Sequence, residues 1–275
     1  MLRSLDAVLD VMRVPASGDA SVAVVPCPDF YGVRGERCEI LVVGGGTGGV
    51  AAALAAASAG RQVVLLEETD WLGGQLTSQG VSALDEHEYI ESFGGTRSYY
   101  DLRNAIRAHY GASNPGNCWV TRLAFEPRVA VGLIEQMLPP EVAIYRRTKT
   151  VAVTTEGDRI TEVTAMGLDD GRCVRFRPHL VIDATELGDL LPLCGAEHVI
   201  GAETIAQTGE PQAQPIEPKP HCVQSFTYTF ACERRPAGEI HVIPRPEKYE
   251  HYKALQPYSL RIEVHAGEIY GETSG

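Results

Sequence analysis

The chain has 275 residues, of which 44% are hydrophobic and 22% are charged, and its formal net charge is −12 at pH 7. A chain of this length and apolar content folds as one large domain or as one and a half smaller ones. The excess of negative charge argues against nucleic acid or an anionic membrane as a partner. No apolar run reaches the roughly 18 residues that a membrane-spanning helix needs.

The first 37 residues are predicted to form a leader or connector. Their apolar residues, from Leu2 to Met12, fall at helical spacing, but Asp6 and Asp10 interrupt the run and argue against a signal peptide. We therefore expect a short amphipathic helix or a disordered leader, followed by a loose connector over residues 15–35.

Seven cysteines are scattered along the chain, and no two of them have the C-x-x-C spacing. This pattern predicts neither a zinc ribbon, nor an iron–sulfur cluster, nor a disulfide framework. We expect no metal site and a reducing, cytoplasmic setting.

A glycine-rich turn joins the first predicted strand, Glu39–Val43, to a helix that contains the alanine-rich run 50–59. In such a turn Gly44 permits the tight bend, Gly46 lets the backbone approach a pyrophosphate, and Gly49 allows the helix to pack closely on the strand. The N-terminus of the helix offers free N–H groups and the positive end of its dipole to phosphates.

A second predicted strand, Val63–Leu66, ends at Glu67. This acid follows Gly44 by roughly 20 positions, the distance at which an acidic residue holds a ribose hydroxyl of a bound dinucleotide. Strand, turn, helix, strand and acid together predict binding of an adenine dinucleotide. The motif leaves NAD and FAD open, and it argues against NADP, which favours a basic residue nearby.

The sequence after Glu67 points to one of these cofactors. The chain carries the words VVGGGTGGVAAALAAA, LLEETDWLGGQLTSQGVSALDEH, NPGNCWVTRLAFEP and DATELGDLLPLCGAE. Through them, over about residues 38–209, it resembles the FAD-dependent oxidoreductase family of the glutathione-reductase-like FAD superfamily, with heterodisulfide-reductase-A-like flavoproteins as relatives. The resemblance implies FAD as the cofactor.

The resemblance also implies how FAD lies. Its pyrophosphate is expected at the glycine turn and its adenosine ribose at Glu67, while residues 73–75 run along the pyrophosphate and ribitol toward the flavin. At Glu186 the superfamily usually has glycine, and this departure puts a close approach of the backbone in doubt there. The residues that the resemblance assigns to the cofactor are Gly44, Gly46, Thr47, Gly48, Gly49, Glu67, Gly73, Gly74, Gln75, Thr77, Val151, Ala184 and Thr185.

The remaining patterns predict an α/β fold. Helices are expected at Arg97–Tyr110 and from Pro127 to Pro139–Pro140, and strands at 142–145, 151–154, 160–166, 173–176 and 179–182. The predicted architecture is a three-layer, Rossmann-like FAD-binding domain over residues 38–195, with an insertion at 73–116 and a β-meander at 148–177. Residues 196–275 are expected to begin a second, substrate-facing domain, with a linker at 209–220 and a strand at 223–231.

His87 is the candidate catalytic residue. It follows Thr77 by about ten positions, where the chain should be leaving the flavin ring, and the pKa of a histidine normally lies near neutrality. A solvated loop histidine is the alternative. Cys118 as a redox thiol and Arg122 as an anchor for an anionic substrate are weaker candidates, because a buried cysteine and an ion-paired arginine are commoner.

The predicted function is FAD-dependent oxidoreduction, in which a small organic substrate passes hydride to the flavin and an unknown acceptor reoxidises it. Two alternatives stay open: an iron–sulfur-linked electron-transfer flavoprotein subunit, and a non-catalytic dinucleotide-binding module. Relatives return to the FAD domain with a last strand and helix, and this sequence stops at Gly275 before such a return. We therefore expect an incomplete flavoprotein with weak FAD binding and little turnover on its own.

Overall fold

The structure is a computed structural model that describes residues 34–116, 118, 121–224, 229, 236, 238–239, 242, 244–255, 259–265 and 268–274. The chain divides into two compact units, one ending at Thr229 and one beginning at Phe230. The predicted domain boundary at 195 stays a prediction, and most of the predicted strand 223–231 lies outside the described residues. No helix among the described residues is long and apolar enough to cross a membrane.

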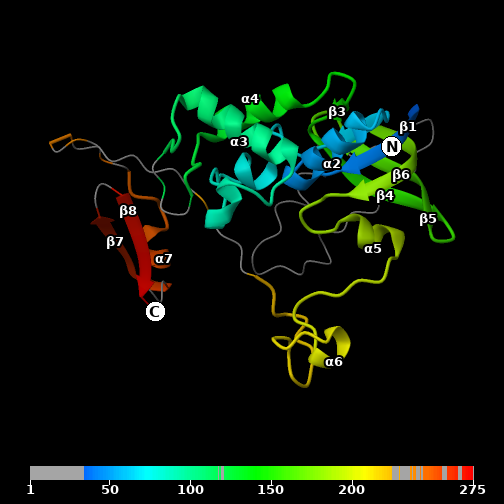
Figure 1. Cartoon of the computed structure of the whole chain (residues 1–275). Coiled ribbons are helices and arrows are strands. Elements are labelled where there is room, and N and C mark those ends of the chain that lie inside the picture. The colour runs from blue at the N-terminus through cyan, green and yellow to red at the C-terminus, as the bar shows by residue number, and fades with distance from the viewer. Residues whose placement is uncertain are drawn as a thin grey trace. The chain divides into compact units, whose positions relative to one another are not determined.

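The first unit is built on a six-stranded mixed sheet with the order β3-β2-β1-β6-β5-β4 (Figure 1). Strands β3, β2, β1 and β6 run parallel, whereas β5 runs antiparallel to both β6 and β4. The strands are β1 (Arg34–Val43), β2 (Val63–Leu66), β3 (Ala143–Tyr145), β4 (Thr148–Glu156), β5 (Arg159–Gly167) and β6 (Cys173–Asp183).

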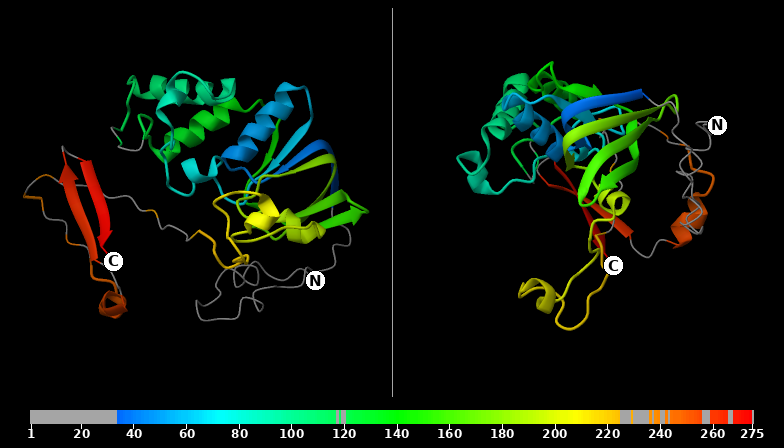
Figure 2. Two further views of the ribbon diagram at one scale, coloured as in Figure 1. Left: turned by 60° about the horizontal axis from the view of Figure 1, so that its bottom comes forward. Right: turned by 90° about the vertical axis from the view of Figure 1, so that its right-hand side faces the viewer.

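Helices cover one side of this sheet. Figure 2 shows α2 (Thr47–Ser58) lying along the parallel strands, with α3 (Arg97–Tyr110) and α4 (Pro127–Met137) beside it. Helix α3 has the predicted bounds, and α4 begins at the predicted Pro127 and ends at Met137, just before the predicted end at Pro139–Pro140. The described residues of this unit also contain four short helices: η2 (Gly74–Leu76), η3 (Glu88–Glu91), α5 (Leu190–Cys194) and α6 (Ile205–Thr208).

Successive residues of β1 pack into two cores on opposite faces of the sheet, as the two-residue period of a β-strand requires. Val42 faces the cluster formed with α2, α3 and α4, whereas Leu41 and Val43 face a second cluster that includes Phe176 and Leu190. All four residues of β2 are buried, as expected for a parallel strand with both faces covered. The predicted α/β class with a Rossmann-like sheet is confirmed.

Strands β1 and β6 extend well beyond their predicted ranges, and β4 and β5 are also longer than the sequence predicted. Strand β1 begins at Arg34 instead of Glu39, because its polar first half pairs with the first half of β6. The predicted strands 173–176 and 179–182 are one continuous strand, β6, which passes through Pro178. Pairing of β6 with β5 ends at Phe176, so one edge of β6 is open where the proline lacks its N–H.

The second unit contains a helix and a hairpin in its described residues. Helix α7 spans Tyr249–Leu255, and strands β7 (Ser259–His265) and β8 (Glu268–Ser274) pair antiparallel. The sequence analysis did not predict any of these three elements.

Candidate functional site

The glycine turn is as tightly constrained as its spacing predicts. Gly44 has φ +98°, and a Cβ there would lie 2.3 Å from the carbonyl oxygen of Ala184. A Cβ on Gly49 would lie 1.8 Å from the carbonyl oxygen of Gly44. The first glycine therefore lets β1 turn against the end of β6, and the last lets α2 pack directly on the turn.

The second glycine pair lies against this turn. The N–H of Gly73 donates to the carbonyl of Gly45 at 2.8 Å, and the hydroxyl of Thr47 donates to the carbonyl of Gly73 at 3.1 Å. A Cβ on Gly74 would come within 2.9 Å of the Cα of Gly46. Two glycine segments, joined by a hydrogen bond between residues that lie 26 positions apart, thus form one cradle of bare backbone at the N-terminus of α2.

Glu67 fastens the turn to the end of β2. Its carboxylate is 7% exposed, and it accepts the N–H of Gly45 at 2.9 Å and the N–H of Thr69 at 2.7 Å. Each carboxylate oxygen has two lone pairs, so both oxygens keep acceptor capacity for a hydroxyl. Sequence spacing located this acid but gave no sign of its two backbone contacts.

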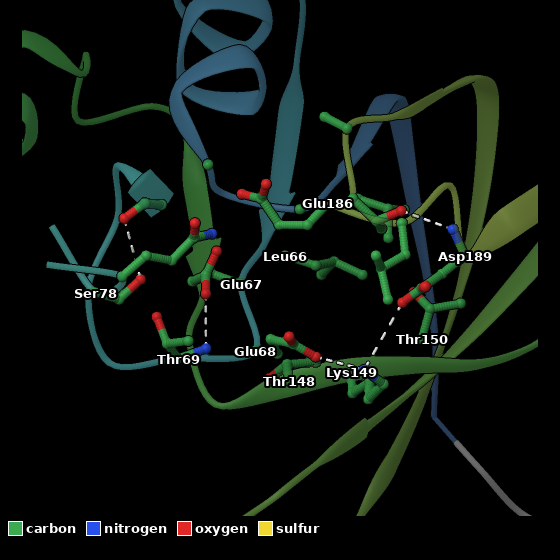
Figure 3. Close-up of a pocket in the computed structure, with 18 residues that line it drawn as sticks. Leu66, Glu67, Glu68, Thr69, Ser78, Thr148, Lys149, Thr150, Glu186 and Asp189 are labelled. Atoms are coloured by element: carbon green, nitrogen blue, oxygen red, sulfur yellow. Dashed lines mark hydrogen bonds and ion pairs between the residues drawn. The ribbon is translucent and has the colours of Figure 1, made fainter. Parts of the chain in front are cut away.

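A cavity of about 260 Å³ opens at the carboxyl ends of β1, β2 and β6, beside the start of β4 (Figure 3). In open parallel sheets, this end is where ligands bind. The cavity brings together Gly44, Gly46, Glu67, Gly74, Ala184 and Thr185 from the predicted set, and Glu186 also lines it. The lining residues that sequence reasoning missed include Glu68, Thr69, Ser78, Gln79, Thr148, Lys149, Thr150 and Asp189.

Lys149 is the cation of this cavity. Its Nζ lies 2.5 Å from a carboxylate oxygen of Glu68 and 3.7 Å from one of Asp189. Burial works against the charged form, but the hydrogen bond and charge of Glu68, together with Asp189, raise the pKa of Lys149 above its usual value. Lys149 is therefore protonated at neutral pH, and the three side chains hold one another at the rim.

Thr150 provides an unpaired polar group. Its side chain is 8% exposed, and among the described residues its Oγ1 is the single buried side-chain oxygen or nitrogen without a hydrogen-bond partner. Buried polar groups are normally paired, so an unpaired hydroxyl on a cavity wall favours a polar ligand there. No sequence signal distinguishes Thr150 from the other threonines of β4.

The other predicted cofactor residues do not line the cavity. Thr47 and Gly73 support the cradle from behind, and the hydroxyl of Thr77, which is 1% exposed, donates to the carbonyl of Leu72 at 2.7 Å. Val151 lies at an irregularity where the pairing of β4 with β5 shifts register. The members of the predicted set outside the lining are Thr47, Gly48, Gly49, Gly73, Gln75, Thr77 and Val151.

The candidate catalytic residues gather at a different place. His87, Cys118 and Arg122 all line a second hollow of about 630 Å³, together with Glu86, Glu88, Tyr89, Glu91, Asn114 and Thr121. The side chain of His87 is exposed, and its Nδ1 accepts the N–H of Tyr89 at 3.3 Å. His87 does not line the cavity at the glycine turn.

A buried ion-pair network supports this second hollow. Arg103 is 1% exposed and contacts Glu86 at 2.7 Å and Glu91 at 2.8 Å. The hydroxyl of Tyr99 donates to Glu86 at 2.5 Å. Burial raises the pKa of Tyr99, and the neighbouring Glu86 carboxylate raises it further, so the phenol stays protonated. Arg107 completes the network through a 2.7 Å contact with Glu91.

The cradle fits a dinucleotide cofactor. It combines backbone that side chains would obstruct, a helix N-terminus that no side chain caps and whose first turn holds no acidic residue, a ribose-type acid and an unpaired hydroxyl. Its volume is slightly below the roughly 300–1,000 Å³ of ordinary ligand sites.

Comparison with known structures returned several flavoproteins at low similarity. A flavoprotein/dehydrogenase from Cytophaga hutchinsonii has 18% identity and a TM-score of 0.44, covering 61% of this chain and 44% of that one. Thermovibrio ammonificans THI4 has 15% identity and a TM-score of 0.41, covering 61% and 67%. L-proline dehydrogenase from P. horikoshii has 20% identity and a TM-score of 0.34, covering 56% and 23%.

These scores are too low to carry an argument, and the chain spans less than half of the dehydrogenase structures from C. hutchinsonii and P. horikoshii. A comparison with curated proteins gave no match. The family model for FAD dependent oxidoreductases, in contrast, matches residues 39–270, which is most of the chain. The narrower kinship to heterodisulfide-reductase-A-like flavoproteins stays a prediction. The chain belongs to the FAD-dependent oxidoreductase family, and FAD is its cofactor.

Proposed function

We propose that the cavity at the glycine turn holds the pyrophosphate and adenosine of FAD, and that the protein oxidises a small organic substrate. The observation that carries the proposal is the cradle itself, where Gly46 and Gly74 line the cavity with backbone that carries no side chain, at the N-terminus of α2. Bound FAD would supply the acceptor for a hydride. The chain's own residues supply position, charge and hydrogen bonds.

Each part of the cradle has a separate task in this proposal. The first N–H groups of α2 have no partner within the helix and donate to phosphate oxygens. The free lone pairs of Glu67 accept ribose hydroxyls, and its existing bonds to Gly45 and Thr69 keep it aimed. The hydroxyl of Thr150 gains the partner that it lacks, on the side of the cavity formed by β4.

On the substrate side we propose His87 as a proton donor or acceptor. Because Nδ1 accepts the Tyr89 N–H, the neutral ring carries its proton on Nε2, which is the nitrogen left for a substrate. Arg122 lines the same hollow and would pair with an anionic group of the substrate.

Absorbance of the purified protein after desalting tests the proposal. Bands near ~370 and ~450 nm are expected to stay with the parent and with Gly132→Ala, and to disappear from Gly46→Val. Gly132 is the matched control, because a Cβ there meets nothing within 4 Å. Flavin retained by Gly46→Val at the parent level would contradict the proposed site.

Anaerobic mixing with candidate donors then tests the activity. Bleaching of the ~450 nm band by a small organic donor supports hydride transfer to flavin. A chain that retains flavin but is not reduced by any donor would instead be a dinucleotide-binding module. Stoichiometric iron and acid-labile sulfide would favour the electron-transfer alternative.

A further inference from the structure

Glu186 stands in the phosphate cradle. A Cβ added to Gly46 or to Gly74 would lie 2.7 Å from Oε1 of Glu186, so the carboxylate rests against both bare glycines. Figure 3 shows the side chain directed toward the turn at the N-terminus of α2. Within the described part of the chain, Glu186 has no hydrogen-bond or ion-pair partner that would hold it there.

The position of this carboxylate is the position of a bound anion. Helix α2 begins after Gly46 without a side-chain cap and without an acidic residue in its first turn. Its N–H groups and its dipole therefore attract a negative charge from elsewhere in the fold. Glu186 supplies that charge from the loop after β6, in the place that the phosphates of FAD require.

The backbone that carries Glu186 is fixed on both sides. The carboxylate of Asp183 accepts the N–H of Thr185 at 3.0 Å and the N–H of Leu190 at 3.1 Å, and the N–H of Asp189 donates to the Thr185 hydroxyl at 2.7 Å. Glu186 is itself an exposed residue, so its side chain borders solvent. A change of rotamer at Glu186 would therefore take the carboxylate away from the cradle while the loop keeps its hydrogen bonds.

We propose that Glu186 is an internal counter-anion that occupies the phosphate subsite and must rotate away when FAD binds. This inference rests on the proposed function, because it takes the cradle as the pyrophosphate site. Its consequence is that the charge of Glu186 lowers the affinity for phosphate-bearing ligands and stabilises the ligand-free protein. A glycine at this position would lack both effects.

Binding titrations of the full chain, stripped of flavin, test the inference with FAD, ADP and adenosine as probes. Glu186→Gln keeps the size of the side chain and removes its charge. We expect FAD and ADP to bind ~10-fold more tightly to this variant at low salt, with a smaller gain at high salt. Adenosine has no phosphate and should bind equally to the parent and the variant.

The matched control is Glu197→Gln, which removes the same charge from an exposed position that does not line the cavity. It should bind all three probes within about twofold of the parent, because a distant surface charge is screened. Thermal unfolding gives a second readout. Without ligand, Glu186→Gln should unfold at a slightly lower temperature than the parent, and with ADP the order should reverse.

The outcomes separate two kinds of failure. One outcome is that the parent binds FAD and ADP while Glu186→Gln binds them with equal or weaker affinity. That result would overturn the counter-anion role of Glu186 and leave the proposed function intact. A gain for adenosine equal to that for ADP would also overturn it, because the effect would then be steric. Absence of FAD, ADP and adenosine binding in every variant would overturn the proposed function and the inference together.

Discussion

The two hollows of the first unit are built in opposite ways. The glycine-turn cavity is shaped by backbone: Gly44, Gly46, Gly49 and Gly74 leave room that any side chain would fill. The second hollow is supported by side chains, with a buried arginine, Arg103, between two glutamates. Backbone sites tolerate few residue types and leave a sequence signature, whereas a side-chain network depends on segments that only the fold brings together.

The largest expected effect tests the side-chain hollow. Arg103→Met should lower the free energy of unfolding by about 3–5 kcal/mol, because Glu86 is left buried without its cation. Urea denaturation measures the loss, and FAD titration of the folded fraction should show an unchanged affinity. The double variant Arg103→Met/Glu86→Gln should recover part of the stability. An FAD affinity that fell in parallel would show that the two hollows are coupled.

The glycine turn beside the backbone-built cavity is tested by its tightest glycine, which packs behind the lining. Gly49→Ala should cost about 3 kcal/mol of stability or more, because its Cβ would overlap the Gly44 carbonyl. Gly132→Ala, at a position in α4 where a Cβ meets nothing within 4 Å, should be neutral or slightly stabilising. Thermal unfolding of both variants provides the comparison, and equal melting temperatures would contradict the packing described for the turn.

Glu67 links stability to cofactor binding. Glu67→Ala should weaken FAD binding by about 1–3 kcal/mol, since ribose hydroxyls and two backbone N–H groups lose a charged acceptor. Glu39→Ala is the control, because that carboxylate also accepts a backbone N–H, from Gln62 at 2.7 Å, without lining the cavity. Equal FAD affinity in both variants would remove Glu67 from the site.

A substitution at Thr150 should change stability and FAD binding in opposite directions. Thr150→Val removes a buried hydroxyl that lacks a partner, so the free protein should become more stable by up to about 1 kcal/mol. Binding of FAD should weaken by about 0.5–1.5 kcal/mol, because the ligand loses a hydrogen bond. Thermal unfolding and FAD titration measure the two effects, and tighter binding by the variant would mean that no ligand atom pairs with this hydroxyl.

The smallest expected effect is the response of the second hollow to acid. Burial opposes ionisation of Glu91, but its bonds to Arg107 and Arg103 hold its pKa below the usual 4.5. The stability from these contacts is present above the unfolded-state pKa and is lost as pH falls through the lower folded-state pKa. Between about pH 6 and 3, the free energy of unfolding should therefore fall less in Glu91→Gln than in the parent, by about 1 kcal/mol or less.

Glu88→Gln is the control for that measurement, because Glu88 is an exposed residue of the same short helix. The free energy of unfolding of this control should fall with pH as it does in the parent. The same fall in Glu91→Gln would show that the arginine contacts of Glu91 add no stability.

Sequence patterns located most of the elements near the cofactor cavity. The bounds of β2 and α3 were predicted residue for residue, and the start of α4 at Pro127 was predicted as well, since each has an unbroken apolar pattern and clear end signals. The long polar start of β1 and the passage of β6 through Pro178 were not visible, because pairing between distant strands stabilises them. Local sequence propensity carries no information about a partner strand that lies more than a hundred residues away.

For the site, the sequence by itself determined the glycines and the acid, because close packing and φ > 0 exclude other residues at those positions. Only the tertiary structure decided which side chains face the glycines. Lys149 and Thr150 reach the cavity because the antiparallel strands continue the parallel sheet, and Glu186 reaches the α2 N-terminus because β6 ends beside β1. Such meetings depend on strand order and register, which are properties of the assembled sheet rather than of any one segment.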